Sequence, residues 1–202
     1  MALLSVKTRQ KYLKELGLYT GAIDGYVGPL TRQAYKRLQD TCFIRAKDKD
    51  GLYGKNTDNL LRSVYACKDA PNFKVSEFRC GCGGKYCTGY PVALSRDLVE
   101  NLQTLRRHYG RSITVTSGLR CLTYNKRVGG VTNSEHTKGR AADIYISGQS
   151  DTYNGRVEIV NYWDTLPNSK YAYCNGYMKY VGQNPTKYYS STMGNATHVN
   201  VK

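Results

Sequence analysis

The stretch SEHTKGRAAD, residues 134–143, carries more information than any other part of this sequence. It places His136 and Asp143 seven residues apart, and Gly139 between them allows the chain to turn. Another histidine, His198, lies near the C-terminus in an alternating run that is typical of a strand. Two imidazoles and one carboxylate would leave a fourth position open for water. The residues therefore predict a catalytic zinc site rather than a closed structural one.

The pattern around this stretch predicts a mixed domain of helices and strands. An alternating run begins at Asp143 and places its side chain on the face opposite Ile144 and Ile146. Asn175-Gly176 separates two further alternating runs and is the strongest hairpin signal in the chain. Strands are expected over residues 113–116, 143–146, 171–174, 177–181 and 197–201, and helices over 95–110 and around 157–163. Short strands grouped with separate helices favour an α+β fold.

An internal repeat occupies the N-terminal third of the chain. The sequence DGYVGPLT at residues 24–31 returns as DGLYGKNT at residues 50–57, and each copy leads into a helical spacing of apolar residues. We expect a tight turn at each Asp-Gly pair, and a backbone conformation closed to other residues at the second glycine of each copy. The block resembles the peptidoglycan-binding domain of three short helices found at the ends of many wall hydrolases. The alternative is a generic helical mini-domain with glycine turns.

The strongly basic composition limits the classes of partner. Thirty Lys and Arg residues oppose fifteen Asp and Glu residues, which gives a net charge of +15, and both halves of the chain are basic. Such an excess favours a polyanion such as nucleic acid or an anionic cell wall, unless the charge only aids solubility. No nucleic-acid-binding motif accompanies the charge, so we expect no nucleic-acid partner. No apolar run approaches the roughly 18 residues of a membrane span, and no secretory signal is recognisable, so we expect no membrane insertion.

Seven cysteines make an odd number, which argues against a complete disulfide framework and favours synthesis in a reducing compartment. Four of them, Cys80, Cys82, Cys87 and Cys121, could form a second, structural metal site. Their spacing is irregular for a zinc knuckle. Buried thiols or a local disulfide are the alternatives.

An ordered set of motifs extends over the C-terminal half. The set comprises SGLR at residues 117–120, SEH at 134–136, GRAAD at 139–143 and HV at 198–199. It resembles the zinc D-alanyl-D-alanine carboxypeptidase family, whose fold is shared with Hedgehog proteins, and within it the endopeptidases of phage lysins. The resemblance covers roughly residues 73–202 and implies a zinc domain built on a central antiparallel sheet.

The same resemblance implies roles for individual side chains. His136, Asp143 and His198 would hold zinc, which would polarise the scissile carbonyl and lower the pKa of its water toward roughly 7. Arg120 would be catalytic, because its planar fork suits a substrate carboxylate or a developing oxyanion. Ser134 would contact the substrate or fix its loop.

Two positions depart from the family pattern. Many members place Asp or Glu three residues before the last histidine as the general base, and Asn195 at that position cannot take up a proton. Asn200 stands where related sequences often have Asp. We assign Asn195 and Asn200 to substrate contacts. Either another carboxylate supplies the base or activity is weakened or lost, and the sequence does not choose among the candidates Glu135, Asp151, Glu158 and Asp164. The remaining histidine, His108, is expected at a helix C-terminus in a structural role.

These observations predict a two-domain peptidoglycan hydrolase. We place a peptidoglycan-binding domain over residues 1–66, a linker over 67–72 and a zinc peptidase domain over 73–202. The expected function is that of an endolysin that is made in the host cytoplasm and acts as a monomer on the cell wall after release. It would cut a stem-peptide or cross-link bond as a carboxypeptidase or endopeptidase. The alternative is a wall-binding protein whose zinc domain has lost catalysis.

Overall fold

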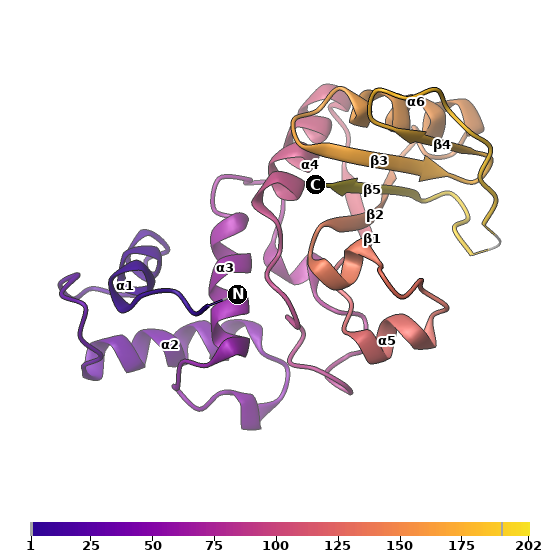
Figure 1. Cartoon of the computed structure of the whole chain (residues 1–202). Helices are drawn as coiled ribbons and strands as arrows, with labels where there is room; N and C mark the ends of the chain where they lie inside the picture. The colour runs from indigo at the N-terminus through magenta and orange to yellow at the C-terminus, as the bar shows by residue number, and fades with distance from the viewer. Residues whose placement is uncertain (1, 191) are drawn as a thin grey trace.

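A computed structural model describes residues 2–190 and 192–202, and it has a helical N-terminal part and a sheet-containing C-terminal part (Figure 1). The helices are α1 (Val6–Glu15), α2 (Pro29–Cys42), α3 (Lys55–Ala66), α4 (Arg96–Tyr109), α5 (Leu122–Arg127) and α6 (Tyr153–Asp164), with short 3-10 turns η1 (Ala46–Asp48), η2 (Val75–Phe78) and η3 (Glu135–Lys138). The strands are β1 (Ile113–Ser117), β2 (Ala141–Ile146), β3 (Ser169–Cys174), β4 (Tyr177–Tyr180) and β5 (Thr197–Val201). The predicted α+β class, with three N-terminal helices and a central antiparallel sheet, is confirmed.

Each copy of the repeat is closed by a buried glutamine from the preceding helix. Gln10 of α1 donates from Nε2 to Asp24 Oδ1 at 2.7 Å and to the Tyr26 carbonyl at 3.0 Å, and its Oε1 accepts the Gly25 N–H at 2.9 Å. Gln39 of α2 makes the corresponding bonds in the second copy, to Asp50 at 3.1 Å, to the Leu52 carbonyl at 2.9 Å and from the Gly51 N–H at 2.7 Å. The repeat is therefore one structural unit, a helix that satisfies the polar groups of the loop after it.

The two glycines in each copy of the repeat have backbone conformations that differ from the prediction. The first glycine of each copy has the left-handed backbone, with φ of +88° at Gly25 and +73° at Gly51. The second glycines, Gly28 and Gly54, are extended residues at the N-caps of α2 and α3, with φ of −89° and −122°. The expectation that the second glycine needs a conformation closed to other residues was wrong. The turn itself requires the glycine that follows Asp.

The five strands form one antiparallel sheet in the order β1-β2-β5-β3-β4. The predicted hairpin around Asn175-Gly176 joins β3 to β4, and Gly176 has the positive φ of +94° that such a turn needs. Helix α6 packs along β3 and β4, and α4 contacts β5, so these helices cover one face of the sheet. That face carries the apolar side chains, including Ile144 and Ile146 without exposed surface. The opposite face is left for polar side chains.

The helical and sheet-containing parts are in direct contact. Asn59 on α3 donates to the Pro91 carbonyl at 2.9 Å, and Ser63 Oγ accepts the Leu94 N–H at 3.0 Å. The apolar core continues from α3 into α4 across this contact. In the part of the chain that the structure describes, no helix has the length and apolar character required to cross a bilayer.

Candidate metal centre and active-site cavity

The candidate site lies on the sheet face opposite α4 and α6, where the strand register places four side chains in one row. Ser117 on β1 pairs with Asp143 on β2, Asp143 pairs with His198 on β5, and His198 pairs with Tyr173 on β3. Directly paired residues in an antiparallel sheet project their side chains from the same face. The prediction that Asp143 points away from Ile144 and Ile146 is thereby explained.

The three predicted metal ligands converge at this row. Asp143 Oδ1 lies 2.8 Å from His198 Nδ1 and 3.3 Å from His136 Nε2. One ligand atom from each side chain lies within 4.8 Å of the other two. Residues separated by 62 positions in the sequence, from His136 to His198, thus form one compact group.

His136 is oriented by the backbone of the strand-to-helix loop. Its Nδ1 lies 2.7 Å from the Gly118 carbonyl oxygen, so Nδ1 carries the proton and Nε2 keeps its lone pair toward Asp143. The Gly118 backbone also packs closely on Phe78, and only glycine fits there, because a Cβ at Gly118 would lie 2.5 Å from the backbone of Phe78. Gly139, with φ of +75°, ends η3 three residues after His136 and turns the chain into β2. The turn anticipated between His136 and Asp143 is confirmed.

His198 is held from behind by Asn200. The Asn200 amide nitrogen lies 3.1 Å from His198 Nε2, and its Oδ1 accepts the Tyr171 N–H at 3.3 Å. Asn200 has no exposed surface and does not line the cavity described below. The prediction that Asn200 contacts the substrate was therefore wrong, since strand alternation puts its side chain beside the histidine and under β3.

The local charges keep the carboxylate ionised and the imidazole neutral. Burial raises the pKa of Asp143, but hydrogen bonds and charge from His136 and His198 outweigh this effect and hold the pKa well below its usual range. Burial lowers the pKa of His198, against the raising effect of Asp143. Arg120 also contributes, because its Nη2 donates to Asp143 Oδ2 at 2.7 Å. Ionised carboxylate and neutral imidazole are the forms that bind a divalent metal.

This donor set fits zinc. One imidazole nitrogen from each histidine and one carboxylate oxygen face a common point, and the hydrogen bond to the Gly118 carbonyl orients the first histidine as in zinc proteins generally. The side of the group away from the sheet opens into a cavity. His136, Asp143 and His198 thus form a site that can hold a zinc ion with a position left for a ligand from solution.

The cavity has a volume of about 670 Å³, and the three ligands lie in its wall with Arg120, Ser134 and Asn195. Arg120 is held in place by Ser117 Oγ, which accepts from its Nε at 3.0 Å and from its Nη2 at 2.8 Å. Asn195 is exposed, and its Oδ1 accepts from Arg156 at 3.2 Å. The structure thus brings Arg120, Ser134 and Asn195 to the site, whereas it leaves Asn200 behind it.

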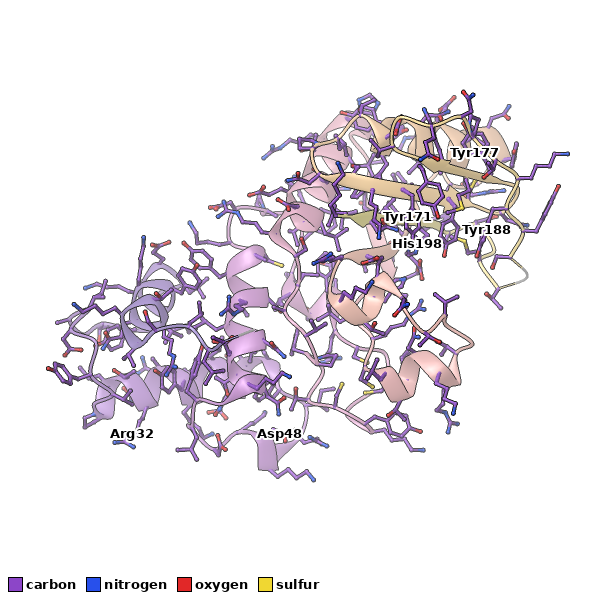
Figure 2. The ribbon with its side chains drawn as sticks, viewed as in Figure 1. Arg32, Asp48, Tyr171, Tyr177, Tyr188 and His198 are labelled. Atoms are coloured by element: carbon purple, nitrogen blue, oxygen red, sulfur yellow. The ribbon has the colours of Figure 1, made fainter. Side chains whose placement is uncertain are left out.

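Three tyrosines of the cavity were not anticipated from the sequence. Tyr173 stacks on the His198 ring with centroids 4.4 Å apart, Tyr171 lies 5.8 Å from the same ring, and Tyr188 packs on Tyr173 at 4.3 Å. Figure 2 shows Tyr171, Tyr188 and His198 gathered on one side of the sheet. The alternation of Tyr171 and Tyr173 along β3 was visible in the sequence, but only the β3–β5 register places both next to the histidine.

The replacement carboxylates proposed from the sequence separate into two groups. Glu135 lines the cavity, its Oε1 accepts from Lys170 at 2.7 Å and Lys138 at 3.2 Å, and its buried Oε2 has no hydrogen-bond partner among the described residues. The other three do not line the cavity, and each has a partner of its own: Asp151 accepts from Tyr145, Glu158 from Gln149 and Asp164 from Lys179.

The remaining histidine has no part in this group. His108 lies at the end of α4 and stacks on the Tyr162 ring with centroids 3.7 Å apart. Its position agrees with the structural role expected for it.

Comparison with known proteins finds a matching family model for each of the two parts of the chain. Residues 71–165 match the family model of peptidase M15, and residues 4–61 match that of the peptidoglycan-binding domain. The zinc D-Ala-D-Ala carboxypeptidase of Streptomyces albus G is 36% identical over an alignment of 134 residues that covers 63% of this chain and 51% of that protein. The chain therefore spans about half the length of this curated relative.

The peptidase match contains His136 and Asp143 but ends before His198, which the sequence motifs predicted and the geometry places beside them. Both matches agree with the helical and sheet-containing parts of the fold. The chain thus carries a domain of the peptidase M15 family behind an N-terminal peptidoglycan-binding domain.

Proposed function

We propose that this protein is a zinc-dependent peptidase that hydrolyses a peptide bond in the stem peptide or cross-link of bacterial peptidoglycan. The observation that carries the proposal is the convergence of His136, Asp143 and His198 on one wall of an open cavity. The peptidoglycan-binding domain supplies the substrate class, because it would hold the chain on the polymer that contains such peptides. The relative from Streptomyces albus G is named for a reaction of the same type.

The residues of the cavity suit distinct tasks in this reaction. Zinc held by the three ligands would supply Lewis-acid activation of water and of the scissile carbonyl. Arg120 presents a guanidinium whose Nε and Nη2 are fixed by Ser117, so its remaining donors can bind a substrate carboxylate or the developing oxyanion. Ser134 and Asn195 offer neutral polar groups to the peptide, and Tyr171 and Tyr188 offer flat apolar surfaces beside it.

Glu135 is our candidate for the proton acceptor that Asn195 cannot be. It lines the cavity next to His136, and its buried Oε2 has no hydrogen-bond partner among residues 2–190 and 192–202. Burial raises the pKa of Glu135, but the hydrogen bonds from Lys170 and Lys138 lower it by more than burial raises it. The pKa therefore lies below its ordinary value, and the group is ionised at neutral pH. An ionised carboxylate with a free oxygen can take a proton from an attacking water.

The wall-binding part would concentrate the enzyme on its substrate. Of the tyrosines that could stack on sugars, Tyr19 and Tyr35 belong to the core, whereas Tyr26 is 78% exposed in the first repeat loop. The net charge of +15 would strengthen attachment to an anionic wall at low salt. A monomeric endolysin that acts at the wall after release from the cytoplasm is the biological role we infer.

A non-catalytic wall-binding protein is the second candidate, and the exposed Asn195 favours it. Digestion of purified peptidoglycan separates the two, with mass spectrometry of the released fragments to identify the bond cut. We expect fragments with new peptide termini from the parent protein and none from His136→Ala. Parent protein that binds the walls but releases no more than His136→Ala would establish the non-catalytic alternative.

The proton acceptor is tested in the same assay. Glu135→Gln should lower the rate by about 10²–10⁴-fold and remove the acidic limb of the pH–rate profile, with Glu158→Gln as the control. If instead Asn195→Asp raises the rate strongly and Glu135→Gln changes little, no carboxylate has replaced the missing base.

A further inference from the structure

Four cysteines from two separate segments meet at the edge of the sheet-containing part. Cys80, Cys82 and Cys87 belong to the loop after η2, and Cys121 follows Arg120 at the N-cap of α5. All four are free thiols, and their Sγ atoms lie within 4.8 Å of one another. We call this group the cysteine cluster.

The spacing of the sulfurs matches a metal site and not a disulfide. The Sγ atoms of Cys82 and Cys87 are 3.5 Å apart. Zinc–sulfur bonds of about 2.3 Å in a tetrahedron place neighbouring sulfurs about 3.8 Å apart, whereas a disulfide bond is about 2.05 Å long. One pair at 3.5 Å and all four sulfurs within 4.8 Å of one another fit the ligand set of a closed structural zinc site.

Backbone amides point at three of the four sulfurs. The Cys121 N–H donates to Cys80 Sγ at 3.3 Å, the Gly89 N–H to Cys87 Sγ at 3.4 Å and the Tyr124 N–H to Cys121 Sγ at 3.4 Å. Hydrogen bonds to the sulfur stabilise a thiolate, which is the form that binds metal. The loop therefore has an outer shell of donors around the cluster as well as the sulfurs themselves.

The shape of the loop depends on glycines with left-handed backbone. Gly83 and Gly84 have φ of +60° and +84°, and they turn the chain directly after Cys82, where the Lys85 N–H returns to the Cys82 carbonyl at 3.0 Å. Gly89 has φ of +105° and follows Cys87 by two residues. This backbone holds few apolar side chains, so a cross-link through the sulfurs would supply the order that packing does not.

We propose that Cys80, Cys82, Cys87 and Cys121 bind a second zinc ion, in a structural site separate from the His136, Asp143 and His198 site. Binding would replace four thiol protons by one dication and leave a net charge of −2 on the group. The stems of Arg45 and Arg79 lie against Gly84 and Gly89, so cationic side chains border the cluster. Zinc is the metal chosen by four thiolates in tetrahedral arrangement.

The position of the cluster gives the metal two tasks. Cys121 is adjacent in sequence to Arg120, so a metal that fixes Cys121 to the loop also fixes the backbone that carries the Arg120 guanidinium. The loop in turn packs on the N-terminal part, because Gly84 lies against Ile44. The second zinc would thus position Arg120 and connect the loop to the wall-binding part, without contacting substrate.

Metal analysis of the purified full chain, prepared under reducing conditions and loaded with zinc, tests the proposal. We expect two zinc ions per chain in the parent. One should remain in the His136→Ala, His198→Ala double variant and one in the Cys82→Ser, Cys87→Ser double variant. The matched control is Cys67→Ser, which changes a half-buried cysteine outside the cluster and should keep both ions.

Cobalt substitution of the parent checks the ligands without any mutation that could impair folding. Cobalt in the cluster should give the intense thiolate-to-metal charge-transfer absorption that a site of two histidines and one carboxylate lacks, and the double histidine variant should retain it. Loss of zinc from the cluster should lower kcat and leave zinc at the histidine site unchanged, as expected for a metal that positions Arg120. The proposal is overturned if the reduced, zinc-loaded parent holds one ion, if cobalt gives no thiolate absorption, or if mass spectrometry finds a Cys82–Cys87 disulfide in freshly prepared protein. A cluster that fails this test leaves the peptidase proposal intact, because zinc at the histidine site is counted separately.

Discussion

Replacing Asn200 by leucine should weaken zinc binding at the histidine site without touching a ligand. The His198 ring faces Asp143 with Nδ1, so Nδ1 is the atom available to a metal, and the ring proton must then reside on Nε2. The atom of Asn200 that faces Nε2, at 3.1 Å, is its amide nitrogen, which donates, so a metal on Nδ1 requires the buried amide to turn its oxygen toward the Nε2–H. Leucine has the same branching at Cγ and no polar atom, so it leaves the Nε2–H without an acceptor.

The expected loss follows from the role of such outer partners. Removing a group that orients a metal-bound histidine costs about 10–100-fold in metal affinity, or about 1.4–2.7 kcal/mol. The Tyr171 N–H also loses its acceptor at 3.3 Å, which should lower the free energy of unfolding by about 1–3 kcal/mol. Asn200→Asp should act in the opposite direction on metal binding, because a carboxylate can accept from both His198 Nε2–H and the Tyr171 N–H. Its zinc affinity should equal or exceed that of the parent.

Competition with a chromophoric chelator measures the dissociation constant of zinc at the histidine site. The His136→Ala, His198→Ala variant, measured in the same way, shows how much of the signal comes from zinc bound elsewhere. The matched control is Asn101→Leu, since Asn101 is also buried but donates to the Pro167 carbonyl at 2.7 Å, away from the site. Asn101→Leu should lose stability and keep its zinc affinity. If Asn200→Leu binds zinc as tightly as the parent, residue 200 does not orient His198, and the reasoning fails.

Three further changes test the site and the wall-binding part. Arg120→Lys should lower turnover on peptidoglycan by at least about tenfold with zinc content intact, since a point charge cannot replace the planar fork; normal turnover would make Arg120 structural. Gln39→Leu should lower the melting temperature and weaken sedimentation with insoluble peptidoglycan, because the buried Gly51 N–H loses its acceptor, at a cost of about 1–3 kcal/mol, and the Leu52 carbonyl loses its donor. An unchanged melting temperature would contradict this. Burial raises the pKa of Asp58, but bonds from the Leu4 N–H, Arg62 and Tyr53 lower it below the ordinary 3.8, so its stabilisation is present above that value and is lost as the pH falls below it. Asp58→Asn should therefore be less stable than the parent at pH 7 by about 1.5–3 kcal/mol and should approach it in acid, and a difference that persists in acid would refute the assignment.

The elements of secondary structure could be predicted from local sequence. Alternation gave the strands, and the Asn175-Gly176 pair gave the hairpin between β3 and β4. Ser95 and Gly110 lie at the two ends of α4 as expected, although Ser95 makes no side-chain capping hydrogen bond. These features are local, since a backbone conformation depends on residues within a few positions of one another. The short helix α5 carries no such periodicity and was missed. The boundary proposed at residues 67–72 stays a prediction.

The candidate site, like the fold, has features that the sequence predicted and features that only the tertiary structure decided. The sequence by itself predicted which residues could supply ligand atoms, because the motifs that contain His136, Asp143 and His198 resemble those of a zinc peptidase family. Only the tertiary structure decided which atom each ligand presents, that Asn200 lies behind His198, and that Tyr173 stacks on it, because these follow from the register of β2, β5 and β3. The glutamines that close the two repeat loops and the meeting of Cys121 with the loop after η2 were decided there too. Such contacts join segments far apart in the chain, where no local pattern records the partner.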